Sequence, residues 1–149
     1  MTATNNSKQQ RTMAIDPGEK RIGVAISDTS GTFTKPLMVI SHISRDKDVE
    51  KILQICRENN VLKIVVGFTQ NEDGSLPPSG RSAIKLADAL RLKKEIIVDL
   101  WDEFETTKEA EKILIKINKP SKLRRGHHDD VAAAILLQSY IDNKINNET

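Results

Sequence analysis

Apolar residues along this chain first form short runs of the β type and then recur at helical spacing. In the second run Ile22 and Val24 alternate with smaller neighbours, which is typical of a strand. Pro17 and Gly18 favour a turn after the first run, so the chain is expected to double back as a hairpin. Pro36 favours an edge strand or an irregular start in the third run. The pattern therefore predicts three opening strands, over residues 13–16, 22–27 and 32–40.

Helices and strands alternate in the rest of the chain. Apolar residues at helical spacing, and compact apolar runs between them, predict helix 44–60, strand 61–68, helix 79–91, strand 95–101, helix 106–117 and helix 129–143. Strand–helix–strand units require parallel pairing with right-handed crossovers, whereas the opening hairpin requires antiparallel pairing. We therefore expect an α/β fold with a mixed five-stranded sheet, antiparallel over the first three strands and then parallel, flanked by helices.

Length and composition fit one soluble domain. The 149 residues are 38% hydrophobic and 30% charged, and no apolar run is long enough to cross a membrane. We expect a disordered tail over 1–11, a single domain over 12–143, a polar tail over 144–149 and a cytoplasmic location, since the N-terminus lacks an apolar signal segment. Cys56 is the only cysteine, and it falls on a helical apolar stripe, so it is expected in the core rather than as a nucleophile.

Carboxylates follow or open several of the predicted elements. Asp16 ends the first strand, the pair Asp102 and Glu103 follows the last strand, and the pair Asp129 and Asp130 opens the last helix. The carboxyl ends of parallel strands form one edge of a sheet, where sites are usually built. Acids gathered there repel one another unless a cation binds, and oxygen ligands suit Mg²⁺ or Mn²⁺ better than zinc. The alternative is local: a turn residue, loop acids and a helix N-cap.

Basic residues gather in two places although the net charge is only +2. Lys20 and Arg21 follow Asp16, and the segment 116–128 contains lysines, arginines and two histidines but no acid. Lysine and arginine beside a metal site suit a phosphodiester backbone, whereas the alternative for such a segment is a solvated loop. The candidate nucleic-acid contacts are Lys20, Arg21, Lys119, Lys122, Arg124, Arg125 and His128. Which of His127 and His128 would contact phosphate or transfer a proton stays open.

The segment 15–25, IDPGEKRIGVA, resembles the opening signature of the YqgF-like family, whose members are described as Holliday junction resolvases or pre-16S rRNA nucleases of ribonuclease H-like fold. Further segments similar to the family are 65–67, 71–75, 102–111 and 129–140. Together they extend over almost the whole predicted domain, in the family's order. The opening signature is the most specific of them.

The resemblance implies an acidic triad of Asp16, Glu103 and Asp129, with Asp102 and Asp130 just outside the ligand set of Mg²⁺ or Mn²⁺. It also implies hydrolysis of nucleic acid by in-line attack of water on phosphorus. The chain departs from the family where it carries Phe104 in place of an arginine, Glu105 at a usually apolar position, Thr69 in place of a proline and His128 in place of an aliphatic residue. The missing arginine leaves substrate geometry open.

Three functions are compatible with these residues. The resemblance favours 5′-end processing of pre-16S rRNA in ribosome biogenesis. One alternative is a Holliday junction resolvase in DNA recombination or repair, and another is a non-catalytic nucleic-acid-binding module of the same fold. An actin-like phosphate-binding domain is disfavoured by the short chain. The expected partner is pre-rRNA or branched DNA, no membrane partner is expected, and the protein is expected to be a monomer or a homodimer, since symmetric resolution of a junction needs two sites.

Overall fold

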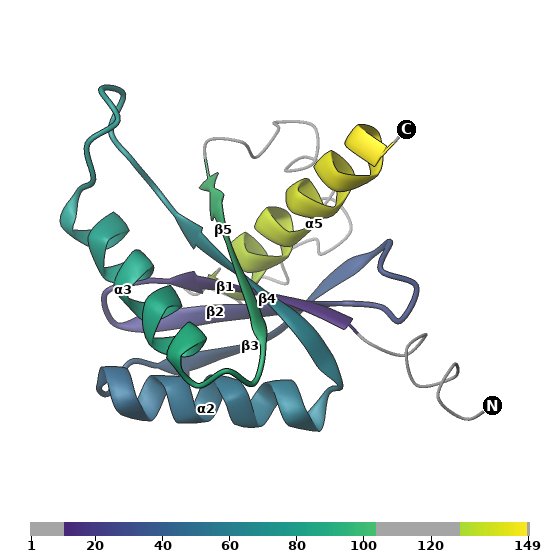
Figure 1. Ribbon diagram of the computed structural model, residues 1–149, viewed down its shortest axis with the longest axis horizontal. Helices are drawn as coiled ribbons and strands as arrows, with labels where there is room; N and C mark the ends of the chain where they lie inside the picture. Colours follow the sequence, from purple (N-terminus) through teal and green to yellow (C-terminus); the bar gives the residue numbers. More distant parts are fainter. Residues whose placement is uncertain (1–10, 104–128, 149) are drawn as a thin grey trace, which may run out of the picture.

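The computed structural model describes residues 11–103 and 129–148 (Figure 1). Within them the strands are β1 (Arg11–Pro17), β2 (Arg21–Ser27), β3 (Thr34–Ser41), β4 (Val61–Phe68) and β5 (Ile97–Asp102). The helices are α2 (Arg45–Glu58), α3 (Pro78–Leu92) and α5 (Asp129–Glu148). The predicted helix 106–117 and the basic segment 116–128 lie outside the described residues.

The strands form one sheet in the order β3-β2-β1-β4-β5. The β1–β2 and β2–β3 pairs are antiparallel, and the β1–β4 and β4–β5 pairs are parallel, which confirms the predicted mixed sheet. The strand that contains Pro36 lies at an edge, and its register shifts between Val24 and Ala25 of β2, where Pro36 pairs with Ala25. Proline is tolerated at such a place because it has no backbone N–H to donate to the ladder.

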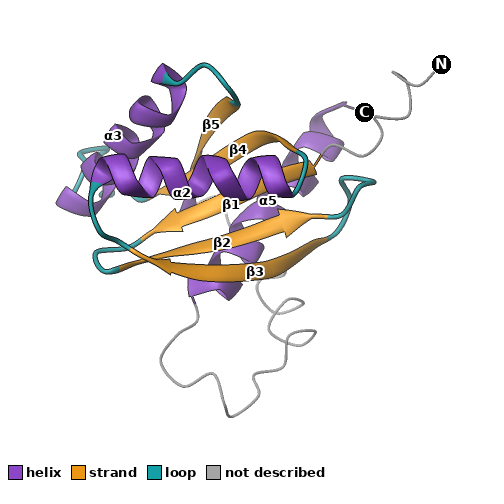
Figure 2. Ribbon diagram, turned by 90° about the horizontal axis from the view of Figure 1, so that it is seen from below, coloured by secondary structure: helices purple, strands orange, loops and turns teal. Residues whose placement is uncertain are grey.

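Helices cover both faces of the sheet. Helices α2 and α3 lie on one face and α5 crosses the other, as Figure 2 shows. Side chains alternate along β1, so Met13 and Ile15 join the core under α2 and α3, whereas Ala14 joins the smaller core under α5. Asp16 continues the alternation of Ala14 and therefore faces α5.

Several element ends differ from the predicted ones. Strand β1 begins at Arg11, which the sequence placed in the N-terminal tail, and the Arg11 N–H donates to the Asn60 carbonyl at 3.0 Å. Helix α5 continues to Glu148 instead of ending at 143, so the pattern located the helix but not its end. The rest of the expected N-terminal tail, residues 1–10, lies outside the described residues, as does 149.

Helix α2 has the features that its sequence predicts. The Ser44 hydroxyl accepts a hydrogen bond from the Lys47 N–H at 3.2 Å and so caps the first turn. Cys56 is buried, which confirms its place in the core, and burial raises the pKa of its thiol to about 12. A thiol in that state is a weak nucleophile at neutral pH. Across the described parts of the chain, no helix has both the length and the apolar character needed to span a bilayer.

Candidate active site

The carboxyl ends of β1, β4 and β5 meet at one edge of the sheet because these strands are parallel. Asp16 is the penultimate residue of β1, Asp102 is the last residue of β5, and Glu103 follows directly. Helix α5 begins with Asp129 at the same edge, where its first residue lies directly over Gly23 of β2. Acids that are remote in the sequence therefore lie at one place.

Two glycines allow the start of α5 to approach the sheet closely. Gly23 pairs with Asp16 across β1 and β2, and a Cβ on Gly23 would lie only 1.9 Å from the Asp129 carbonyl oxygen. A Cβ on Gly67 of β4 would lie 2.2 Å from Leu136 Cδ1 and 3.1 Å from Glu103 Oε1. A side chain at Gly23 would therefore displace the helix backbone that places Asp129 next to Asp16.

The Asp16 carboxyl is in a strongly perturbed environment. Burial, a hydrogen bond with the Glu103 side chain and the negative charges of Glu103 and Asp129 raise the pKa of Asp16 to about 9. In the absence of a cation this environment favours the protonated form of Asp16, whose O–H can donate to Glu103. This interaction joins β1 to the residue after β5 and shows that the three carboxyls are within electrostatic reach of one another.

The guanidinium of Arg21 forms an ion pair with Asp129, the third acid of the predicted triad. Its Nε donates to Asp129 Oδ2 at 3.0 Å, in a pair that is partly exposed on both sides. The pair connects the beginning of β2 to the beginning of α5. The Asp129 carboxylate is thus already partly neutralised by a guanidinium, which is also the type of group that binds phosphate.

The remaining acids of the predicted set are held by nearby donors. Asp102 Oδ2 accepts a hydrogen bond from Gln70 Nε2 at 2.7 Å, and Asp130 Oδ1 accepts one from the Val131 N–H at 2.9 Å. Gln70 did not appear among the sequence-predicted residues. The available signal was its position shortly after a buried strand, which is the same signal that singled out Asp102.

The donor chemistry of these carboxyls suits a hard divalent cation. Within residues 11–103 and 129–148, no three His, Cys, Asp or Glu side chains are placed so that they could hold a metal ion. The carboxyls are engaged by other groups: Asp16 hydrogen-bonds with Glu103, and Arg21 pairs with Asp129. A cation would compete with the proton of that hydrogen bond and with that guanidinium for carboxylate oxygens, the ligands that Mg²⁺ and Mn²⁺ prefer.

The predicted basic contacts divide between described and undescribed parts of the chain. Lys20 is exposed in the turn between β1 and β2, and Arg21 lies in the site. The other predicted contacts lie outside the described residues: Lys119, Lys122, Arg124, Arg125 and His128. Phe104, where the family usually has an arginine, lies outside them as well.

Solved structures of junction-resolving enzymes share this fold. The chain superposes on Thermus thermophilus RuvC in complex with a Holliday junction substrate with a TM-score of 0.65 and 13% identity, over 92% of this chain and 96% of that one. It superposes on a fowlpox virus resolvase bound to Holliday junction DNA with a TM-score of 0.56 and 14% identity, over 91% and 99% of the two chains. At these identities the likeness shows a common fold.

Relatives closer in sequence cover nearly the whole chain. A protein of Thermoanaerobacter pseudethanolicus named "putative pre-16S rRNA nuclease" is 41% identical over 137 residues, which are 91% of this chain and 99% of that protein. A protein of the same name from Clostridioides difficile is 38% identical over 136 residues, which are 91% and 96% of the two chains. The family model described as "RuvX: Holliday junction resolvase" matches residues 10–143. The chain therefore belongs to the RuvX, or YqgF-like, family.

Proposed function

We propose that this protein is a metal-dependent nuclease that hydrolyses phosphodiesters in structured nucleic acid, in one domain over residues 12–143. The observation that carries the proposal is the convergence of Asp16, Glu103 and Asp129 at one sheet edge, where their mutual repulsion and burial favour a protonated Asp16. A carboxylate group of this kind, next to the cationic Arg21, suits a site for divalent cation and phosphate.

Each residue has a distinct part in the proposed mechanism. Asp16, Glu103 and Asp129 would hold Mg²⁺ or Mn²⁺, with Asp16 at the centre of the three. A divalent ion bound there supplies a Lewis acid that activates water and neutralises charge on the phosphate. Arg21 would exchange Asp129 for a phosphate oxygen, and Lys20 in the adjacent turn would bind a neighbouring phosphate. Gln70 holds Asp102 and thereby fixes the end of β5 just before Glu103.

The substrate we propose is the 5′ end of pre-16S rRNA, in the cytoplasm. The relatives named for this activity support it, because each is aligned over more than nine tenths of its length. The family description supports a second candidate, resolution of four-way DNA junctions. That function would require two active sites and hence a homodimer, whereas trimming of one RNA end can be carried out by a monomer.

Cleavage by purified protein tests the proposal. We expect wild-type protein to cleave a pre-16S rRNA 5′ leader in Mg²⁺ or Mn²⁺. We expect Asp16→Asn to lower the rate to below about one thousandth, as happens when one member of a catalytic group is removed. Asp28→Asn, which changes an aspartate in the distant β2–β3 turn in the same way, is the matched control and should retain the rate.

Three outcomes would count against this assignment. If Asp16→Asn cleaved as fast as wild type, Asp16 would not be a catalytic residue. Binding without cleavage, by wild-type protein on RNA and on a four-way junction alike, would favour the non-catalytic module. Cleavage of the junction alone, with a solution mass that doubles on the junction, would favour the resolvase.

A further inference from the structure

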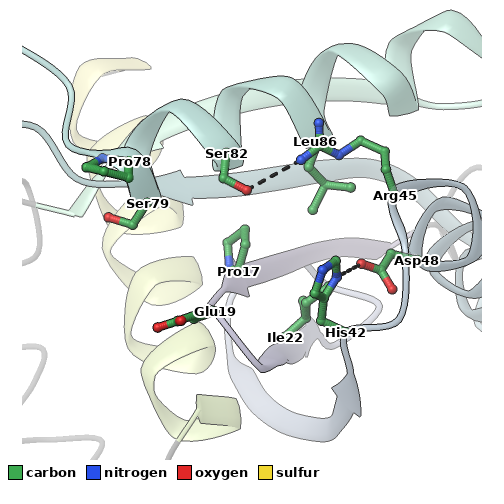
Figure 3. Close-up of a pocket in the computed structure, with 11 residues that line it drawn as sticks. Pro17, Glu19, Ile22, His42, Arg45, Asp48, Pro78, Ser79, Ser82 and Leu86 are labelled. Atoms are coloured by element: carbon green, nitrogen blue, oxygen red, sulfur yellow. Dashed lines mark hydrogen bonds and ion pairs between the residues drawn. The ribbon is translucent and has the colours of Figure 1, made fainter.

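A cavity of about 570 Å³ lies at the same sheet edge as the acids but on the face that carries α2 and α3 (Figure 3). Its walls come from the β1–β2 turn, the residue after β3 and the first turns of α2 and α3. None of the three acids lines it. The residues that line it include Pro17, Ile22, His42, Arg45, Ser82 and Leu86.

The ring of His42 lines one side of the cavity, and Asp48 fixes its position. Asp48 is buried, accepts a hydrogen bond from the Ile43 N–H at 3.1 Å and contacts His42 Nδ1. Because Asp48 engages Nδ1, the orientation of the ring is fixed, and Nε2 is the ring atom that can meet a ligand. The His42 N–H also donates to the Lys20 carbonyl at 2.9 Å, which ties this wall to the β1–β2 turn.

The opposite side of the cavity carries donors on two helices. Arg45 Nη2 of α2 lies 3.4 Å from Ser82 Oγ of α3, near the long limit for a hydrogen bond, and the contact is exposed. Ser79 adds a second hydroxyl from the first turn of α3 (Figure 3). A ligand that binds Arg45 and Ser82 would therefore break only the weak contact between them.

The charges of the cavity favour a neutral ligand over a phosphate. The lining includes one arginine, Arg45, and two carboxylates, Glu19 and Asp48, so it carries no excess of positive charge. Pro17, Ile22 and Leu86 add apolar surface to it. Ligand pockets are usually apolar with a few placed polar groups. Unpaired bases are bound by stacking on aromatic rings, histidine included, or on guanidinium planes, with hydrogen bonds to their edges, and His42 and Arg45 offer such groups here.

The cavity lies next to the proposed scissile position. Pro17 follows Asp16 in β1, and neighbouring side chains of a strand point to opposite faces. The β1–β2 turn directly follows Asp16 and lines the cavity, so a nucleic-acid strand with one phosphate at Asp16 can reach the cavity along this turn. We propose that this cavity binds an unpaired nucleobase of a nucleotide flanking the cleaved phosphate. The proposal rests on the nuclease function proposed above and adds a base-binding position to it.

Scanning a substrate with abasic sites tests the proposal. The protein is Asp16→Asn, which binds without cutting, and the probes are an RNA stem-loop with single-stranded flanks and a four-way DNA junction. We expect one abasic position beside the branch or stem to weaken binding about five- to tenfold, as loss of a bound base does. We expect this difference to disappear when Ser82→Trp fills the cavity or Arg45→Ala removes its donor.

Lys85→Ala is the matched control for Arg45→Ala. It removes one exposed positive charge from α3 without touching the cavity, so it should keep the abasic difference even if overall affinity falls. The proposal is overturned if no abasic position matters in either probe, or if the difference persists unchanged in both cavity variants. Because the readout is binding, a wild-type protein that binds but never cleaves would refute the nuclease function and leave the base-binding position standing.

Discussion

The two faces of the sheet are packed with side chains of different size. The core under α2 and α3 consists mainly of large aliphatic side chains, among them Met13, Ile15, Ile52, Ile64 and Leu90. The core under α5 has a larger share of small side chains, Ala14, Ala25, Ala133 and Ala134, beside larger ones such as Leu136 and Tyr140. Glycines add to this difference, since both Gly23 and Gly67 would clash with α5 or with Glu103 if they carried a Cβ.

The difference separates stability from positioning. Large buried side chains stabilise the fold in proportion to the apolar area they remove from water, so the α2–α3 face should carry most of the stability. Small side chains bring backbones close together, and on the α5 face this closeness places Asp129 beside Asp16. Substitutions on the α2–α3 face should therefore mainly lower stability, and substitutions on the α5 face should mainly lower activity. The following experiments are ordered by the expected size of their effect.

The largest effect should come from a cavity in the large core. Ile52→Ala should lower the free energy of unfolding by about 2–5 kcal/mol, because it leaves a void at a fully buried position. The kcat/KM of the folded protein should change less than about threefold, because distant sites are nearly independent. Urea unfolding and cleavage assays measure both quantities. Leu92→Ala, at a position 78% exposed, is the control and should alter neither; a lost kcat/KM in Ile52→Ala would contradict the separation of roles.

Adding one methyl group on the other face should impair activity. In Gly23→Ala the new Cβ meets the Asp129 carbonyl, so α5 must shift, and we expect cleavage to fall about 100-fold, the usual result of misplacing a reacting group by about 1 Å. Stability should fall by about 1–3 kcal/mol. Gly67→Ala is the comparison: its Cβ meets the side chains of Leu136 and Glu103 and not the backbone of α5, so the helix need shift less and the loss should be smaller. Equal activity of Gly23→Ala and wild type would show that the close approach is not needed.

The smallest effect concerns the proton on Asp16. Its pKa is raised from 3.8 to about 9, so between these pH values the folded state holds a proton that the unfolded state has lost. Without divalent ions, stability should therefore decrease as pH rises through this window. Asp16→Asn should be more stable than wild type at pH 8 by at least about 1 kcal/mol, and the advantage should vanish near pH 4.

Thermal unfolding in chelator measures this difference. Mg²⁺ or Mn²⁺ added at pH 8 should raise the unfolding temperature of wild type and not that of Asp16→Asn, because binding to the folded state alone stabilises it. Glu50→Gln, an exposed substitution on α2, should behave like wild type throughout. A wild-type protein whose stability is independent of pH from 4 to 9 would contradict the protonated Asp16.

The order of the described elements was predictable because it depends on local patterns. Alternation at Ile22 and Val24 and helical spacing in 44–60 and 129–143 are properties of neighbouring residues, and the structure confirms the elements that they predict. Parallel pairing then follows from chain connectivity, and it places the carboxyl end of β1 beside those of β4 and β5. Element ends were less predictable, as Arg11 and the last turns of α5 show, since hydrogen bonds and packing decide them.

The sequence by itself thus determined the strands, the helices, the sheet and the acids that follow its strands. Only the tertiary structure decided that Arg21 pairs with Asp129, 108 positions away, and that the Asp16 side chain hydrogen-bonds with that of Glu103. It also decided that residues of α2 and α3 form a cavity with Pro17, the residue that follows Asp16. The reason is that a pairing, a pKa and a cavity depend on distances between elements, which are set by how closely Gly23 lets α5 approach and by how Asp48 holds His42.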